Sequence, residues 1–210
     1  MDKKEFNEII NYRHACKTFC KKKIINDEDI KFILEAGRMS PSSFGMEGWK
    51  FLVITNNELK EKLRLACWNQ AQITTCSHLV VILSAIEDLY PDTLHVKEKF
   101  KRRRLTKEQE EAYLKRYADF IQKEANNDDK MFAWSSKQTY LAAMSMMLAA
   151  STLKIDSCPI EGFEREKVEE ILKLDTKKYR VSLILPFGYR IYPPKQHLRA
   201  DFEDVVEFID

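Results

Sequence analysis

The chain has 210 residues, enough for a sizeable core, and its 44% hydrophobic and 32% charged residues are typical of a soluble globular protein. The formal net charge of +2 gives no support to a nucleic-acid-binding protein, and neither a membrane helix of ~18 apolar residues nor a secretory signal is apparent. The five cysteines contain no CxxC pair, which favours reduced thiols in a cytoplasmic protein over a disulfide framework.

The first half of the chain alternates predicted helices with two buried strands. Phe6, Ile9 and Ile10 fall at helical spacing and predict a first helix that ends near residues 12–14. Asn26 can cap a second helix, because the acidic residues that follow it suit the positive end of a helix. A loop at 41–43 then leads to a strand at 49–55, a helix at 57–68 and a second strand at 78–85.

The second half of the chain opens with a charged, helical segment at 91–128 that ends in a loop near 126–129. The helix predicted at 132–153 contains AAMSMMLAA, and we expect it to be buried nearly all round, as a central or interface helix would be. A short helix at 164–173, a third core strand at 179–189 and a polar tail follow. Three strands among many helices, without repeats or linkers, predict one α+β domain over residues 1–210.

Five short segments carry side chains suited to binding, and each has a simpler explanation. Arg13, His14 and Lys17 could hold an anion, or only complement the C-terminal end of the first helix. Residues 40–49 (SPSSFGMEGW) could contact a ligand through hydroxyls or merely connect two elements. The amides in 68–72 (WNQAQ) could bond the edge of a heterocycle or simply end a helix.

The tail and the CPIEGF segment complete this set. Lys195, His197 and Arg199 form a second cationic group, or a solvated terminus. In CPIEGF, Pro159 and Gly162 stand close together in a chain with only six prolines and five glycines. A glycine there would let a backbone amide approach a flat ligand closely.

In this order, the segments resemble those of the oxygen-insensitive, FMN-dependent nitroreductase and flavin reductase family. The matching segments are RHACK (13–17), SPSS (40–43) before Trp49, NQAQ (69–72) before SHLV (77–80), KQTYL (137–141), PIEGF (159–163) and a basic tail. The resemblance covers nearly the whole chain. It implies a mainly antiparallel central sheet surrounded by helices, an intertwined homodimer, and bound FMN.

The resemblance also implies a set of FMN-binding residues. They are Arg13, His14, Ala15, Lys17, Pro41, Ser42, Ser43, Asn69, Gln72, Pro159, Ile160, Glu161, Gly162, Lys195 and Arg199. Arg13 and the basic tail would hold the phosphate, although the match does not fix which of Lys195, His197 and Arg199 do so. Asn69 and Gln72 would bond the pyrimidine edge, while 41–43 would come from the partner subunit.

Two of these residues are the predicted catalytic ones. Lys17 would stabilise the negative charge of the reduced ring near N1 and O2, and Glu161 would act with Gly162 through backbone amides directed at N5 and O4. Two departures from the family pattern bear on the flavin. Ala15 replaces the usual serine, and Gln72 stands where some members have lysine, which leaves less positive charge near the ring.

The function implied is reduction of nitroaromatics, quinones or related small acceptors by NAD(P)H, in two-electron steps with ping-pong kinetics. The resemblance does not separate NADH from NADPH. The alternative is a flavin-binding or flavin-storing protein with little turnover. The basic run KRRR (101–104) lies near Glu108, Glu110 and Glu111, which favours a solvated helix over nucleic-acid binding. The histidines are too scattered from cysteines and carboxylates to predict a metal site.

Overall fold

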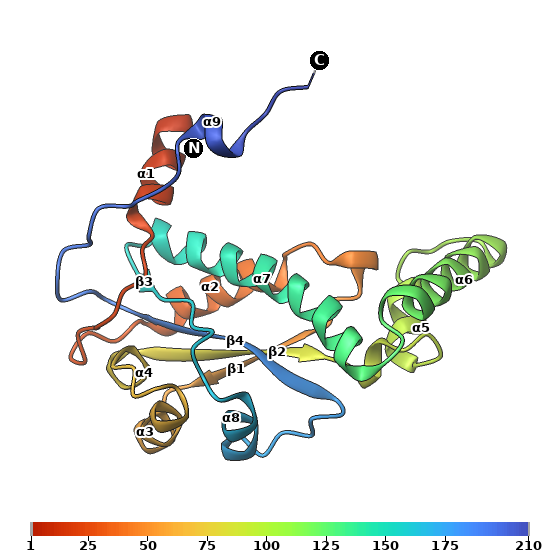
Figure 1. Cartoon of the computed structure of the whole chain (residues 1–210), viewed down its shortest axis with the longest axis horizontal. Helices are drawn as coiled ribbons and strands as arrows, with labels where there is room; N and C mark the ends of the chain where they lie inside the picture. Colours follow the sequence, from red (N-terminus) through yellow and green to blue (C-terminus); the bar gives the residue numbers. More distant parts are fainter. Residues whose placement is uncertain (1, 210) are drawn as a thin grey trace.

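The fold is built on an antiparallel sheet whose strands follow the order β1-β2-β4-β3 (Figure 1). The computed structural model describes residues 2–209. The strands are β1 (Trp49–Ile54), β2 (His78–Ala85), β3 (Asp156–Ser157) and β4 (Tyr179–Gly188). The predicted α+β class is confirmed, and the three expected strands are present. The sequence reasoning missed β3, because a strand of two residues has no periodicity to detect.

Helices surround this sheet. They are α1 (Lys3–Tyr12), α2 (Asp27–Arg38), α3 (Asn57–Ala66), α4 (Gln72–Thr75), α5 (Leu94–Lys101), α6 (Lys107–Glu124), α7 (Asp128–Thr152), α8 (Arg165–Ile171) and α9 (Phe202–Val205), with 3₁₀ turns η1 (Ser43–Gly45) and η2 (Glu87–Leu89). No helix within residues 2–209 is long and apolar enough to cross a membrane.

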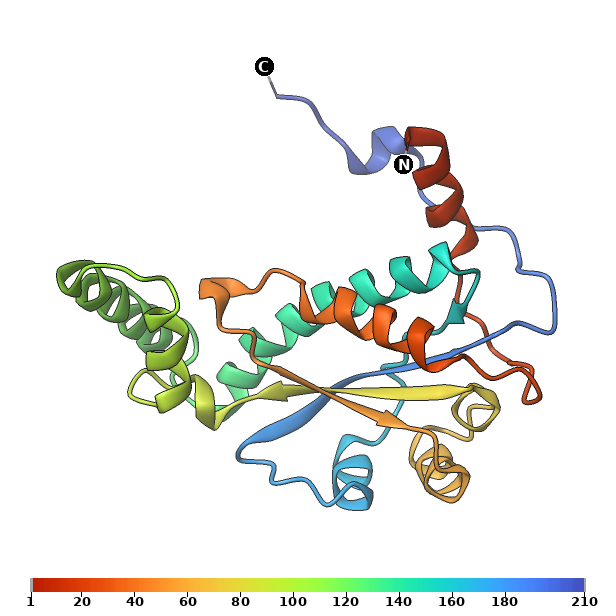
Figure 2. The same ribbon diagram turned by 180° about the vertical axis from the view of Figure 1, so that it is seen from behind.

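Both faces of the sheet are covered, which makes three layers (Figures 1 and 2). One hydrophobic cluster joins α3 and α8 to one face, where β2 contributes Leu79, Val81 and Leu83. A second cluster joins α2 and α7 to the opposite face, where β2 contributes Val80 and Ile82. Because successive side chains of a strand point to opposite faces, the continuous apolar run of β2 supplies both clusters.

Helices α5 and α6 project from one end of the molecule, where a third cluster forms around Phe100, Tyr117 and Trp134 (Figure 1). The predicted helical segment 91–128 is therefore two helices. They are separated at Arg104, which has a left-handed φ of 52°, and α6 then begins behind a capping box at Thr106. Helices α1 and α9 lie close together at the opposite end (Figures 1 and 2).

Helix α7 differs from its prediction in two ways. It begins at Asp128 rather than 132, because the Asn127 side chain caps it by accepting from the Lys130 N–H. It is also not buried nearly all round: Tyr140, Leu141 and Met144 are 40–47% exposed. These three residues are spaced at i, i+1 and i+4, so they form one outward-facing stripe of the helix.

The end of α3 also departs from prediction. The helix stops at Ala66, and the two residues Trp68 and Asn69 take left-handed φ values of 54° and 55° before α4. Such values are uncommon outside glycine and they end a helix. This turn places Trp68 and Gln70 against the PIEGF segment, which bears directly on the site.

Candidate functional site

Strand β3 brings the N-terminal basic segment next to CPIEGF. Ala15 and Ser157 form a parallel β-bridge, and the Cys16 N–H donates to the Ser157 carbonyl at 3.0 Å. Residues 13–17 therefore run alongside residues 156–159. Two segments that are far apart in the sequence share one edge of the sheet, which positions their side chains around the same hollow.

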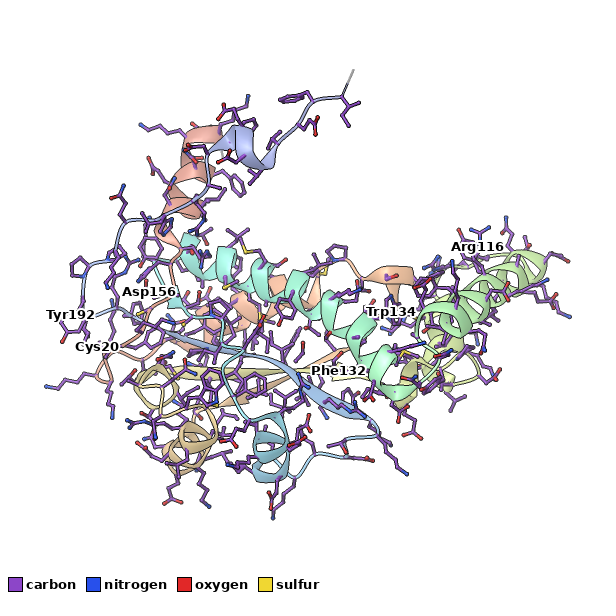
Figure 3. The ribbon with its side chains drawn as sticks, viewed as in Figure 1. Cys20, Arg116, Phe132, Trp134, Asp156 and Tyr192 are labelled. Carbon is purple, nitrogen blue, oxygen red and sulfur yellow. The ribbon has the colours of Figure 1, made fainter. Side chains whose placement is uncertain are left out.

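A buried carboxylate fixes this edge to the tail. The Asp156 side chain is 1% exposed and lies 2.8 Å from the Arg190 guanidinium. The Arg190 N–H donates to the second carboxylate oxygen at 2.8 Å, and the His14 ring lies 3.6 Å from the first. Asp156 lies toward the same end of the molecule as Tyr192 and Cys20, away from Trp134 (Figure 3). The Asp156–Arg190 pair thus joins the start of the tail to β3.

His14 is held in its neutral form by this arrangement. Burial lowers the pKa of the imidazole, the nearby Arg190 charge lowers it further, and Asp156 only partly offsets both effects. Its Nδ1 also lies 3.4 Å from the Tyr12 carbonyl. The neutral ring therefore packs beside Asp156 without adding a further positive charge to the basic segment.

The hollow beside this edge is a cleft of about 740 Å³. Its walls come from residues 13–18, Pro159 and residues 192–199. We call it the cationic cleft, because four basic side chains line it: Arg13, Lys17, Lys195 and Arg199. Among residues 2–209, no carboxylate forms an ion pair with any of the four.

Mutual repulsion acts within the cationic cleft. The pKa of the Arg13 guanidinium is lowered, first by burial and then by the charge of Arg199. A group of like charges without counter-charges is unfavourable, and a bound anion relieves it. The cleft therefore has the chemistry of an anion site large enough for more than an inorganic ion.

Lys17 lies at the junction of this cleft with CPIEGF. Its Nζ is 3.5 Å from the Sγ of Cys158, which is fully buried. Burial raises the pKa of the Cys158 thiol, and the Lys17 ammonium partly offsets that rise. The thiol therefore stays protonated and places no negative charge beside the Lys17 side chain.

A chain of amides connects Gln72 to the PIEGF backbone. Gln72 is buried, and its Nε2 donates to the Gln70 side chain at 2.8 Å. The Gln70 Nε2 donates in turn to the Gly162 carbonyl at 2.7 Å. Sequence reasoning missed Gln70, which holds Gly162 in place, although it lies in the amide-rich segment that was singled out. Asn69 lies on the exposed turn and lines neither hollow described here.

Gly162 is required here by a close approach. A Cβ at this position would lie 2.7 Å from the Trp68 indole, which is too short for any real contact. Its φ is not in the left-handed region. The glycine therefore accommodates Trp68 against the PIEGF backbone, a role that the sequence did not suggest.

A second hollow of about 430 Å³ lies on the other side of Pro159, and we call it the ring pocket. Its walls are Tyr140, Ala143, Met144, Met147, Pro159, Glu161 and Leu183. The Tyr140 hydroxyl donates to the Glu161 carboxylate at 2.6 Å, and burial followed by that carboxylate raises the pKa of the tyrosine. Ile160 instead forms a β-bridge with Ile184, which ties the segment to β4.

The comparisons with known proteins agree with this geometry. A model of the nitroreductase family matches residues 10–189. The chain belongs to the nitroreductase family. YfkO of Bacillus subtilis strain 168, named provisionally as an NAD(P)H nitroreductase, is 38% identical over 99% of this chain and 98% of its own length. A Haemophilus influenzae protein with the same provisional name is 40% identical over 96% of this chain and 95% of its own length.

Solved structures share the fold of this nitroreductase. YdfN of Bacillus subtilis superimposes with a TM-score of 0.86 at 23% identity, covering 99% of this chain and 100% of its own. A protein of Exiguobacterium sibiricum, named provisionally as a nitroreductase and solved in complex with FMN, gives a TM-score of 0.82 at 20% identity and covers 97% of each chain. The predicted family is confirmed, and so is the prediction of an NAD(P)H-dependent oxidoreductase of the nitroreductase type.

Seven of the predicted site residues line neither hollow of their own protomer: Pro41, Ser42, Ser43, Asn69, Gln72, Ile160 and Gly162. Pro41, Ser42 and Ser43 follow α2, where the Ser43 N–H donates to the Gln138 side chain at 3.0 Å. The Ser42 hydroxyl accepts from the Glu47 N–H at 2.9 Å. Their assignment to the partner's flavin stays a prediction, and within one protomer they form a connection between α2 and α7.

Proposed function

We propose that this nitroreductase binds FMN with its phosphate in the cationic cleft and uses it to pass electrons from NAD(P)H to small aromatic acceptors. One observation carries the proposal: four basic side chains meet around one cleft, and no carboxylate within residues 2–209 pairs with them. A flavin mononucleotide brings a dianionic phosphate and a flat ring system. The cationic cleft supplies the positive charges for the phosphate. The adjoining ring pocket leaves room for a ligand beside the flavin ring system.

Arg13 and Arg199 are the primary phosphate ligands in this proposal. A guanidinium group can bind two phosphate oxygens at once, and both side chains line the same cleft. Burial lowers the pKa of Arg13, and the charge of Arg199 lowers it further, which supports their acting on one anion. Lys195 lines the same cleft and adds a point charge. We therefore propose that both Lys195 and Arg199 contribute to phosphate binding; His197 lines the same cleft.

Residues near Pro159 would act on the ring. When bound, FMN supplies the hydride chemistry, accepting from the donor and giving to the acceptor in turn, hence ping-pong kinetics. Lys17 offers a positive charge where negative charge collects on reduction. The bond of Gln72 to the pyrimidine edge stays a prediction, because its Nε2 already donates to Gln70 and the residue lines neither hollow. Gln70 holds the backbone that contains the amides of Glu161 and Gly162.

We further propose an intertwined homodimer. The exposed stripe of α7 is apolar, and the tail exposes Leu198, Phe202, Val205, Phe208 and Ile209 by 60–89%. Apolar surface of this extent on α7 and on the tail is unfavourable in water, which supports contact with a second copy of the chain. In that assembly the 41–43 loop would reach the partner's flavin. The five free cysteines are in keeping with a cytoplasmic location.

The test is the visible spectrum of the purified protein supplied with FMN and titrated with NADPH, and then NADH, without oxygen. We expect a bound flavin band that either donor bleaches and that nitroaromatic or quinone acceptors restore. A folded dimer that retains no FMN would contradict the assignment of the cationic cleft. A protein that retains FMN, but whose flavin band neither NADPH nor NADH bleaches, would instead favour a role in flavin storage.

A further inference from the structure

The two hollows that meet at Pro159 have opposite electrostatic character. The cationic cleft carries four basic side chains, whereas among the described residues that line the ring pocket only Glu161 is charged. The remaining walls are apolar, apart from the Tyr140 hydroxyl. Glu161 is therefore the one charged side chain that a ligand meets among the described residues that line this pocket.

The Glu161 carboxylate is held in place from two sides. The Tyr140 hydroxyl donates to it at 2.6 Å from the rigid helix α7. The backbone next to it is fixed by the Ile160–Ile184 bridge, in which each N–H donates to the other carbonyl at 2.9 and 3.2 Å. A charge fixed by a helix and a strand stays directed at the pocket instead of turning away into solvent.

We propose that Glu161, oriented by Tyr140, selects ring ligands of this pocket by charge. It favours flat rings that carry a positive charge over neutral ones, and it disfavours anionic rings. The inference rests on the proposed function, and it names the class of ligand that the pocket prefers. The nicotinamide ring belongs to that class, since it is cationic in its oxidised form and neutral in its reduced form.

The size of the effect follows from the exposure of the carboxylate. Glu161 is exposed in the protomer, so its charge acts through a medium closer to water than to a protein interior. We expect selectivity between a cationic and a neutral ring of about threefold to tenfold, decreasing as ionic strength rises. A buried carboxylate would give a higher selectivity between the two rings, and a carboxylate directed away from the pocket into solvent would give none.

The experiment compares three ligands built on the same ring: 1-methylnicotinamide, which is cationic, nicotinamide, which is neutral, and nicotinate, which is anionic. Dissociation constants are measured on the resting, FMN-loaded protein by the change in flavin absorption and by calorimetry, without turnover. We expect the order cation, neutral, anion from tightest to weakest. Glu161→Gln should remove about threefold to tenfold of the cation preference, because it keeps the backbone and the shape but not the charge.

Two further variants separate the role of the charge from a structural one. Tyr140→Phe keeps the carboxylate but releases it, so the cation preference should fall by less than in Glu161→Gln. Glu166→Gln removes one charge from the exposed first turn of α8, outside the pocket, and should leave all three constants unchanged.

The outcomes discriminate between this inference and the proposed function. If the wild type binds no FMN, the proposed function is wrong. If FMN binds and NAD(P)H bleaches it, but the ligand ratios are the same in wild type and Glu161→Gln, the charge selection is wrong and the function stands. If none of the three ligands binds the FMN-loaded protein at millimolar concentration, the ring pocket does not take nicotinamide rings and the inference is overturned.

Discussion

Two basic regions of the molecule use the same residue types for different ends. In the cationic cleft, the basic side chains have no carboxylate partner among residues 2–209. At α5, by contrast, the Lys99 ammonium pairs with Glu47, and Arg102 lies 3.5 Å from the same carboxylate. Arg103 donates to the Phe44 carbonyl at 2.6 Å. The number of basic residues therefore does not distinguish the two regions, whereas their carboxylate partners do, and this difference supports the proposed anion site in the cleft.

This difference also accounts for the KRRR segment. Its neighbour Lys99 and two of its arginines fasten α5 to the 44–47 loop, and Arg103 additionally stacks on Phe100 at 5.2 Å and Tyr113 at 5.1 Å. These contacts give the segment a structural role. The prediction that the protein does not bind nucleic acid stays a prediction, and the contacts support it.

We expect the largest effect, on unfolding free energy, to separate two ion pairs: Asp156–Arg190 beside the cationic cleft and Glu47–Lys99 at α5. Asp156→Asn leaves Arg190 without its buried counter-charge, and breaking such a pair costs about 3 kcal/mol of unfolding free energy. Glu47→Gln breaks a pair whose carboxylate is 42% exposed, and should cost about 1 kcal/mol or less. Denaturant unfolding of both variants measures the two costs. Equal losses of unfolding free energy in the two variants would mean that burial does not distinguish the two ion pairs.

The next comparison concerns flavin affinity. Arg13→Ala removes a charged donor to the phosphate, so we expect the FMN dissociation constant to rise about 10- to 100-fold. Arg102→Ala removes a charge of the same kind from α5 and should change it by less than about twofold. Quenching of flavin fluorescence measures both constants. A similar loss in the two variants would show that only overall charge attracts FMN.

The helical part of the fold was predictable because its signals are local. Asn26 caps α2 through the Asp29 N–H at 2.8 Å, as its place before three acidic residues indicated. The outward stripe of α7 was not predictable. Leu141 and Met144 are as apolar as the buried Met146, so composition alone cannot tell a surface that awaits a partner from a core.

The residues of the site also divide into those that were predictable and those that were not. The motif order indicated Arg13, Lys17 and the basic tail, and the structure gathers them around one cleft. The residues that hold this arrangement were missed, because their partners are distant in sequence. Arg190 bonds a residue 34 positions away, and Gln70 bonds one 92 positions away. No periodicity or spacing rule connects such pairs.

A third pair of variants compares the lysines of the two regions. Lys17→Met removes the positive charge proposed to stabilise the reduced flavin, and we expect the two-electron potential of bound FMN to fall by about 30 mV, a tenfold change in the equilibrium. Lys99→Met should leave the potential unchanged and lower the melting temperature, because this side chain is 9% exposed and paired with Glu47. A dye-coupled reduction assay measures the potential. An unchanged potential in Lys17→Met would remove the lysine from its predicted catalytic role.

The smallest effect concerns His14 and pH. Because burial and Arg190 lower its pKa in the folded protein, the unfolded chain binds the proton more readily, and stability is lost as pH falls below the ordinary value of about 6.5. His14→Gln should therefore lose less unfolding free energy than the wild type between pH 7.5 and pH 5.5, in protein without added flavin. Part of the dependence should remain, since burial also lowers the pKa of His78. If the variant and the wild type lose the same unfolding free energy, His14 takes up its proton equally well in the folded and unfolded chains. The conclusion that His14 is neutral beside Asp156 would then be wrong.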